Sequence, residues 1–237
     1  MSRTGLALLL ILLQFDLWYK FLVLLYNQCS KLKRNIRIRD QFLNNVHSGN
    51  KEDNMLDLVP KKLFLTKGKG VHQDQLTSFE YALRDAGIPN TNLVLISSIF
   101  PPGAKIIPRH EGLKLIRPGS VQFVIYARQQ SNEPHRLMAA SVGLAEPSDR
   151  KRWGYLSEYH SFGETEKEAG DYAEDIAAQM LASSLGIPFD VDKNWDEKRQ
   201  QWKVSGQIYK TRNVTQSAVG DSKGRWTTVF AAAVLIL

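Results

Sequence analysis

The order of apolar and polar residues predicts short strands and two longer helices. Val121, Phe123 and Ile125 recur at every second position, which is the period of a strand with one apolar face. A final strand is expected at 225–235, and because it is apolar on both faces we expect it to be buried. Other apolar runs predict strands at 62–66, 92–100, 137–144 and 154–160.

The first predicted helix has clear end signals. Thr77 or Ser78 is a suitable N-cap, the helix is expected to run to about Ala86, and Gly87 suits the position after its end. Glu80 lies off the apolar stripe of this helix. By itself, that position indicates an ordinary solvated carboxylate.

The second predicted helix opens with a capping box made by Thr165 and Glu168, and 186–188 (Gly-Ile-Pro) ends it. The Gly-Lys-Gly sequence at 68–70 is more typical of a turn than of a phosphate-binding loop. Residues 190–203 are highly charged and predict a loop or a short surface helix. Strands outnumber helices and the helices are amphipathic, so we predict an α+β fold with helix-covered sheets.

The first 54 residues differ from the rest of the chain. Residues 5–26 are mostly Leu, Ile, Phe and Val, and ~20 such residues can span a bilayer. Asp16 and Lys20 interrupt this run, at a cost of ~2.5–3.5 kcal/mol each in a lone span. The basic run 31–39 would place its flank on the cytoplasmic side, and a compact signal-peptide cleavage site is missing.

Three interpretations of this segment are open: a weak membrane anchor, an interfacial helix, or upstream sequence joined to a protein that starts near Met55. The polar stretch 44–54 is a plausible linker in each case. The expected organisation is an atypical hydrophobic and basic extension with its linker over 1–54, followed by one folded domain over 55–237.

Composition excludes several classes of function. Of the net charge of +7, residues 1–54 carry +4 and the remainder only +3, without a basic stripe interleaved with aromatic residues. Nucleic-acid binding therefore has little support. The single cysteine, Cys29, excludes an internal disulfide and a cysteine-based metal cluster, which favours a reducing, cytoplasmic location. His160 has no histidine partner at metal-binding spacing, so we expect no metal site.

The strongest chemical signal is the serine pair Ser97-Ser98. An apolar strand runs directly into two hydroxyls and is stopped by Pro101-Pro102 in the sequence Asn-Leu-Val-Leu-Ile-Ser-Ser-Ile-Phe-Pro-Pro, 92–102. Such an abrupt stop suggests backbone strain, which functional sites often hold. One hydroxyl could then attack the preceding carbonyl and cleave the chain. The plain alternative is a strand end followed by a turn.

Three stretches resemble the pyruvoyl-dependent arginine decarboxylases. They are 76–102, which holds the first helix and the serine pair, 154–160 (Gly-Tyr-Leu-Ser-Glu-Tyr-His) and 226–233 (Trp-Thr-Thr-Val-Phe-Ala-Ala-Ala). The match runs in collinear order over roughly residues 58 to 237. Agreement among separate motifs makes it far more specific than any one of them. Because the resemblance begins just after Met55, we favour a protein start near that residue.

The resemblance implies an α+β fold with a four-layer α/β/β/α sandwich, self-cleaved into β and α chains and assembled into trimers or pairs of trimers. Ser98 Oγ would attack the carbonyl of Ser97. β-Elimination, hydrolysis and loss of ammonia would then turn Ser98 into a covalent pyruvoyl group. That group would take the place of pyridoxal phosphate as electron sink, through a Schiff base with the α-amine of L-arginine. The implied product is agmatine, used in polyamine biosynthesis, together with carbon dioxide.

The family pattern also implies roles for three polar residues. Asn92 matches an asparagine that assists self-processing, although a turn residue before a strand is the commoner role. Glu158 matches the proton donor, and we expect its pKa to be raised within an apolar strand; an outward-facing carboxylate is the alternative. Glu80 stands where archaeal relatives hold the guanidinium with aspartate, so its extra methylene alters the depth of the pocket.

Two other functions are open beside arginine decarboxylation. One is the same chemistry on another basic or small amino acid. The other is an unprocessed relative acting as a structural or regulatory subunit. Membrane association is expected only if residues 5–26 are a genuine part of the protein. The Asn-x-Thr sequence at 213–215 is a glycosylation sequon by pattern only.

Overall fold

The computed structural model describes residues 58–186 and 208–237. Within these residues the chain forms two β-sheets, as the sequence predicts. The first sheet has the strand order β2 (Asn92–Leu95), β5 (Val121–Ser131), β9 (Trp226–Ile236), β1 (Lys62–His72) and β4 (Lys105–Ile106). The second has the order β3 (Ile99–Phe100), β7 (Gly154–Phe162), β6 (Leu137–Pro147) and β8 (Ile208–Val219).

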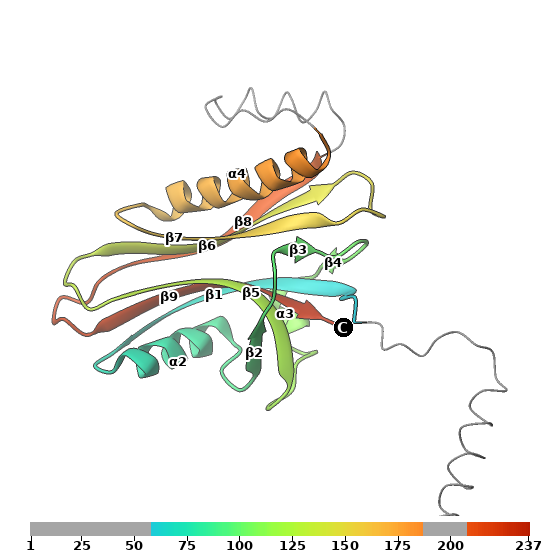
Figure 1. The fold of residues 1–237 in the computed structure, drawn as a ribbon. Coiled ribbons are helices and arrows are strands. Elements are labelled where there is room, and N and C mark those ends of the chain that lie inside the picture. Colours follow the sequence, from blue (N-terminus) through green and yellow to red (C-terminus); the bar gives the residue numbers. More distant parts are fainter. Residues whose placement is uncertain (1–57, 187–207) are drawn as a thin grey trace, which may run out of the picture. The chain divides into compact units, whose positions relative to one another are not determined.

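The sheets face each other, and one long helix covers each outer side. Figure 1 shows the layer order α2 (Gln75–Ala86), first sheet, second sheet, α4 (Glu166–Ser184). A one-turn helix, α3 (Arg109–Gly112), lies beside the first sheet. The described part of the chain is therefore α+β, and its layers are compatible with the expected sandwich.

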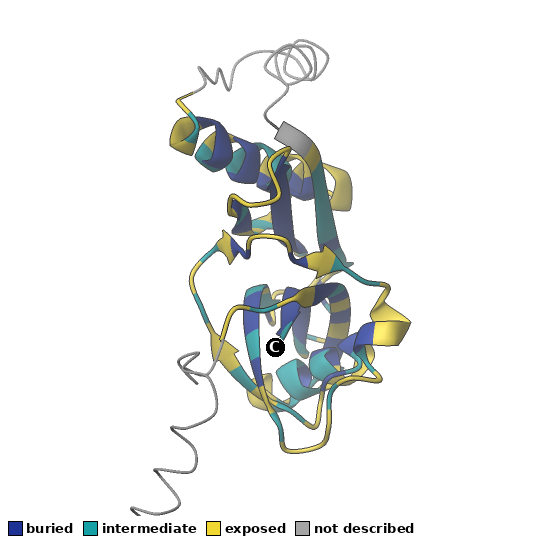
Figure 2. Ribbon diagram, turned by 90° about the vertical axis from the view of Figure 1, so that its right-hand side faces the viewer, coloured by how far each residue is buried: buried dark blue, intermediate teal, exposed yellow. Residues whose placement is uncertain are grey.

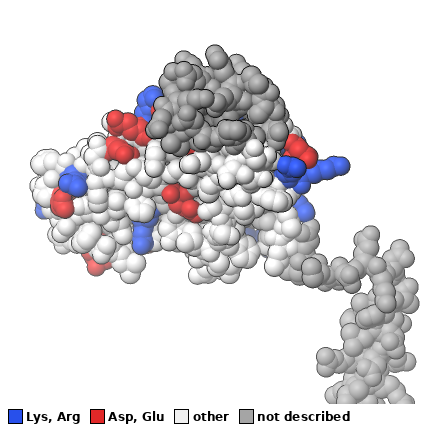
Figure 3. All heavy atoms as spheres, turned by 45° about the horizontal axis from the view of Figure 1, so that its top comes forward, with Lys and Arg blue, Asp and Glu red and all other residues white. Residues whose placement is uncertain are grey.

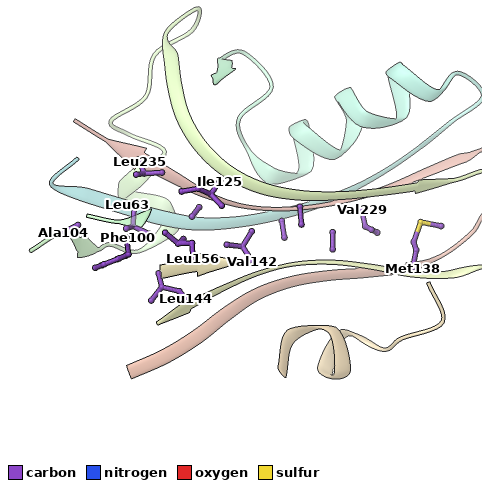
Figure 4. Packing of buried hydrophobic residues seen from close by; sticks show 14 residues of the cluster. Leu63, Phe100, Ala104, Ile125, Met138, Val142, Leu144, Leu156, Val229 and Leu235 are labelled. Carbon is purple, nitrogen blue, oxygen red and sulfur yellow. The ribbon is translucent and has the colours of Figure 1, made fainter. Parts of the chain in front are cut away.

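The main core lies between the two sheets. Figure 4 shows side chains of the first sheet, such as Leu63 and Ile125, pointing toward Val142 and Leu156 of the second. Burying an aliphatic side chain of this size contributes ~1.5–3 kcal/mol, so this layer is a main source of stability. Smaller apolar clusters fill the spaces under α2 and under α4. In Figure 2 buried residues, in dark blue, occupy the strands of both sheets, and exposed residues, in yellow, lie mostly in the connecting loops.

Strand β9 is buried on both faces, as predicted. Ala231 and Ala233 pack in the cluster between the sheets, whereas Phe230 and Val234 pack beneath α2. The strand pairs along its length with β1 on one side and β5 on the other. It is therefore enclosed by two strands, a sheet and a helix.

The two glycines at 68–70 do not form the predicted turn, because both lie inside β1. A Cβ atom on Gly68 would lie 2.2 Å from the carbonyl oxygen of Ala82, and one on Gly70 would lie 2.1 Å from that of Ser78. Both receiving atoms are backbone of α2. The glycines therefore let the helix backbone rest directly on the strand. The Gly-Lys-Gly sequence reflects this close packing and not a phosphate-binding loop.

Helix end signals were largely correct. Gly87 follows α2 with φ of +83°, and Thr165 and Glu168 form the predicted capping box of α4. The N-cap of α2 is Asp74, whose carboxylate accepts from Thr77 N at 2.9 Å, so the predicted start was a few residues late. The terminal position of a helix depends on which side chain reaches the free N–H groups.

Two differences from the predicted strands matter for function. The expected strand 92–100 is divided into β2 and β3, which belong to different sheets. Strand β8 was not predicted, because polar residues fill most of its length.

The expectations for 5–26, Cys29, 44–54 and 190–203 concern segments outside the described residues. Among the helices described here, none is long and apolar enough to cross a membrane.

Candidate active site

The serine pair lies where the chain crosses from one sheet to the other. Ile96 N donates to the carbonyl of Val124 in the first sheet at 3.0 Å. Two residues later, the carbonyl of Ser98 accepts from Leu156 N in the second sheet at 2.8 Å. The Ser97–Ser98 peptide bond is thus held between two backbone anchors, at the open edge where the sheets face each other.

The hydroxyl of Ser98 lies against the carboxylate of Glu158. Ser98 Oγ is 3.2 Å from Oε1 and 3.1 Å from Oε2, with Glu158 as the acceptor. Glu158 is opposite Val142 in the strand pairing, and Val142 belongs to the core between the sheets. Because opposite residues in a strand pair point to the same face, Glu158 points to the inter-sheet side. The fold therefore brings together the expected nucleophile and the expected proton carrier.

Glu158 differs from the expectation in one respect. Its side chain is exposed in the single chain rather than enclosed among apolar neighbours. Within residues 58–186 and 208–237, β3 pairs with Gly154 and Tyr155 and Ser98 O accepts from Leu156 N, so this edge of β7 has no strand partner beyond Leu156. Glu158 lies on that part. The apolar setting expected from the sequence therefore does not come from this chain's own strands.

The Ser97 carbonyl, which Ser98 would attack, has its own donor. Ile99 N donates to Ser97 O at 2.8 Å, which closes a three-residue turn around Ser98. Among the described non-glycine residues a positive φ occurs at His135, so Ser98 has a negative φ. The turn is therefore the common inverse γ form, and the strain suggested by the sequence is not present at this residue.

Asn92 lies away from the serine pair in the same chain. It begins β2, and its Nδ2 donates to the carbonyl of Gly119 at 3.0 Å, joining two loops at the far end of the strand. The length of β2 separates it from Ser98. Within one chain, this geometry matches the turn alternative rather than the assisting role.

Glu80 is also separated from the serine pair. It lies on α2, on the outer side of the first sheet, and accepts from Arg84 Nε at 2.7 Å. Glu158 belongs to the second sheet, so the first sheet lies between the two carboxylates. The structure does not bring Glu80 to Ser98 within one chain.

The remaining sequence signals have structural explanations. Asn213 of the sequon donates to Glu174 Oε1 at 2.6 Å beneath α4, which occupies its amide. His160 lies two positions after Glu158 on β7 and is exposed. Over 58–186 and 208–237, no group of three His, Cys, Asp or Glu residues is placed to hold a metal ion. On the face drawn in Figure 3, basic and acidic side chains are interspersed and no continuous basic stripe is visible.

Two parts of the site have no sequence signal. The N–H groups of Ile99 and Leu156 donate to the carbonyls of Ser97 and Ser98, and every residue except proline carries such a donor, so the residue types do not mark these contacts. Large apolar side chains are also exposed on the elements around the serines; this apolar rim comprises Val94, Leu95, Ile99 and Trp153.

Comparison with known proteins identifies the family of this chain. The family model described as pyruvoyl-dependent arginine decarboxylase matches residues 62–237. The chain belongs to the pyruvoyl-dependent arginine decarboxylase family. The resemblance found in the sequence is confirmed, and the enzyme class and the pyruvoyl cofactor are those that the family name states.

Individual pyruvoyl-dependent arginine decarboxylases are matched over nearly their whole length by about three quarters of this chain. One from Nitrosopumilus maritimus is 74% identical over 183 residues, which is 77% of this chain and 100% of the relative. A pyruvoyl-dependent arginine decarboxylase 2 from Methanosarcina mazei is 53% identical over 179 residues, covering 76% of this chain and 98% of that protein. A probable member from Chloroherpeton thalassium is 54% identical over 181 residues, covering 76% and 100%.

Proposed function

We propose that this protein cleaves itself between Ser97 and Ser98 and then converts L-arginine to agmatine and carbon dioxide. The observation that carries the proposal is the hydrogen bond from Ser98 Oγ to Glu158. Ser98 directly follows the Ser97 carbonyl that its hydroxyl would attack. A carboxylate in that position can take the hydroxyl proton as the oxygen attacks.

The neighbouring contacts suit the cleavage. The Leu156 N–H holds the carbonyl of Ser98, so attack moves the hydroxyl while the backbone of that residue stays fixed. The products are a short chain that ends at Ser97 and a long chain that begins at the former Ser98. Glu158 stays on the long chain, beside its new amino end.

The residues around Ser98 fit the pyruvoyl group. It forms from the side chain and backbone of Ser98 with water as the added reactant and ammonia as the leaving group, and the Glu158 carboxylate already lies within 3.2 Å of the Ser98 oxygen. The pyruvoyl carbonyl supplies the electron sink for loss of the substrate carboxylate. Glu158 holds the proton that replaces that carboxylate, so one side chain is base in the precursor and acid in the mature enzyme.

The substrate pocket requires a second copy of the chain. Glu80 and Asn92 are remote from Ser98 within one chain, and Glu158 is exposed there. A neighbouring copy that covers the apolar rim would enclose Glu158 and could bring its own Glu80 or Asn92 to the site. Assembly as a trimer or a pair of trimers meets this need, with Glu80 binding the guanidinium through paired ionic hydrogen bonds.

We also propose that residues 55–237 form the decarboxylase unit and that 1–54 are an extension. The relative from Nitrosopumilus maritimus is matched over its full length by 183 of the 237 residues, which leaves a segment of the length of the extension unmatched. N-terminal mapping of the protein from its own cells tests this division. Peptides from 1–54 would identify the extension as translated.

Intact-mass measurement tests the proposed cleavage. The wild type should separate under denaturing conditions into two chains broken between Ser97 and Ser98, with the long chain blocked at its amino end. Ser98→Ala should remain one chain and lack activity, because the attacking oxygen is gone. A fully active single-chain wild type would contradict self-processing, and an uncut inactive wild type would favour the non-catalytic alternative. Assays with arginine, lysine and ornithine side by side test the substrate.

A further inference from the structure

The turn around Ser98 has a second feature that bears on the cleavage. Its closing hydrogen bond joins Ile99 N to Ser97 O at 2.8 Å, and Ser97 O belongs to the bond that breaks. Inverse γ-turns are common at strand ends, so the turn alone indicates nothing. Here it is centred on the residue whose hydroxyl contacts Glu158. The turn therefore holds the nucleophile, Ser98 Oγ, next to the electrophile, the Ser97 carbonyl, and the base, Glu158, contacts the nucleophile.

The strand pairing explains why this N–H is available. Leu156 N donates to Ser98 O, which makes Ser98 and Leu156 a hydrogen-bonded pair. In an antiparallel ladder the next pair, Ile99 with Tyr155, is then a non-hydrogen-bonded pair. The N–H of Ile99 therefore points away from β7 and toward Ser97. The register of two short strands is what aims it at the carbonyl.

From this geometry we infer that the backbone N–H of Ile99 is a catalytic group of self-processing, the donor that stabilises the oxyanion on Ser97 during the acyl shift. The inference rests on the proposed self-cleavage and adds a component to it. A preorganised donor aimed at an oxygen that becomes negative strengthens its hydrogen bond as the charge develops.

The step is balanced within the chain. The Ser98 Oγ–H proton passes to Glu158 while Oγ bonds to the carbonyl carbon of Ser97. Negative charge then rests on Ser97 O, beside the Ile99 N–H. Collapse breaks the bond between that carbon and the nitrogen of Ser98, and Glu158 returns the proton to the nitrogen. The product is an ester isomeric with the peptide, so no oxidant, reductant or added reagent is needed.

An amide-to-ester replacement at Ile99 in the full chain removes this donor and keeps the side chain. The same replacement at Phe100, which pairs with Gly154, is the matched control for losing a backbone N–H from β3. Hydroxylamine traps the ester formed at Ser97, and the fragment mass separates that break from cleavage of the introduced ester. The Ile99 ester should form the trapped product ~10²- to 10³-fold more slowly than wild type, as for other oxyanion donors.

A slowing of less than ~10-fold, equivalent to ~1.4 kcal/mol of transition-state stabilisation, overturns the inference, and so does equal slowing by the Phe100 ester. If the wild type gives neither ester nor cut chains, self-processing itself fails, which is a distinct result. A second measurement does not depend on the ester chains folding. In uncut Ser98→Ala, the Ile99 amide should be protected from hydrogen exchange, and an unprotected amide contradicts the assignment.

Discussion

Ser98 and Glu158 are 60 residues apart in sequence, yet the hydroxyl of one lies 3.1 Å from the carboxylate of the other within a single chain. The contact depends on the crossing between the sheets and on the register of β3 against β7. Because one chain suffices to make it, the first proton transfer of the proposed self-processing would not require assembly. The contacts proposed for substrate binding do depend on it.

Glu158→Gln should slow both cleavage and turnover, because the amide can neither take the Ser98 proton nor supply one to the product. Loss of a positioned acid or base typically lowers a rate by ~10²- to 10⁴-fold. Cleavage is followed on denaturing gels, and turnover is then measured on the cut fraction alone. Glu133→Gln, in the loop that joins β5 to β6, is the control for loss of a surface carboxylate. Normal turnover by cut Glu158→Gln would make Glu158 a surface residue.

Glu80→Gln should raise the arginine KM by roughly 10- to 100-fold with normal self-cleavage, since an ionic hydrogen bond is worth ~1.5–3 kcal/mol. In the single chain Glu80 pairs with Arg84, an exposed i,i+4 contact worth only ~0.3–0.5 kcal/mol. Arg84→Gln breaks the same pair and keeps the carboxylate, so its KM should stay near that of wild type. Equal KM changes in the two variants would assign Glu80 to the helix surface.

Gly70→Ala should destabilise the fold, because the new Cβ would lie 2.1 Å from the carbonyl oxygen of Ser78 and force α2 away from β1. Overpacking of this kind typically costs ~1–3 kcal/mol, measured here as a lower denaturant midpoint. Lys69→Ala, at the exposed position beside it, is the control and should change the midpoint little. A stable Gly70→Ala would mean that α2 does not rest directly on the strand.

Glu174→Gln should stabilise the protein at neutral pH. Burial raises the pKa of Glu174 above its usual value, against the opposing hydrogen bonds from Thr211 and Asn213. Its stabilising contribution is therefore present below the unfolded pKa and is lost as the pH rises through the folded pKa. Glutamine keeps an acceptor for Asn213 without the charge. Thermal unfolding should show an advantage for the variant at pH 7 that shrinks by pH 4; a larger advantage at pH 4 would contradict the assignment.

Local patterns in the sequence predicted the fold class and most elements, since strand alternation, the capping box at Thr165 and Gly87 after α2 all act within a few residues. The patterns were less informative where a remote partner decides the outcome. Gly68 and Gly70 look like turn residues until α2 packs on them. Strand β8 has a mixed sequence, because Asn213 and Thr215 make polar contacts with Glu174 of α4 and with Ser141, whereas Val214 and Ala218 pack against the main core.

The same distinction between local patterns and remote partners applies to the candidate site. Ser97, Ser98 and Glu158 could be named from motifs, and the structure brings Ser98 and Glu158 together. The exposure of Glu158 could not be predicted, because it depends on the short length of β3. The donors at Ile99 and Leu156 are backbone N–H groups, so the side chains at these positions do not reveal them. Asn92 and Glu80 stay predictions whose test lies in the assembled protein.

The strand order of the first sheet gives the proposed cut a thermodynamic consequence. Strands β1 and β2 precede Ser98, whereas β4, β5 and β9 follow it, so β1 lies between two strands of the other fragment. For a single uncut chain, taken apart from any assembly, unfolding is unimolecular and its midpoint is independent of protein concentration. Afterwards, complete unfolding releases two molecules, so the midpoint rises with concentration and dilution favours the separated state. Maturation would thus make the stability of the fold depend on how much of the protein is present.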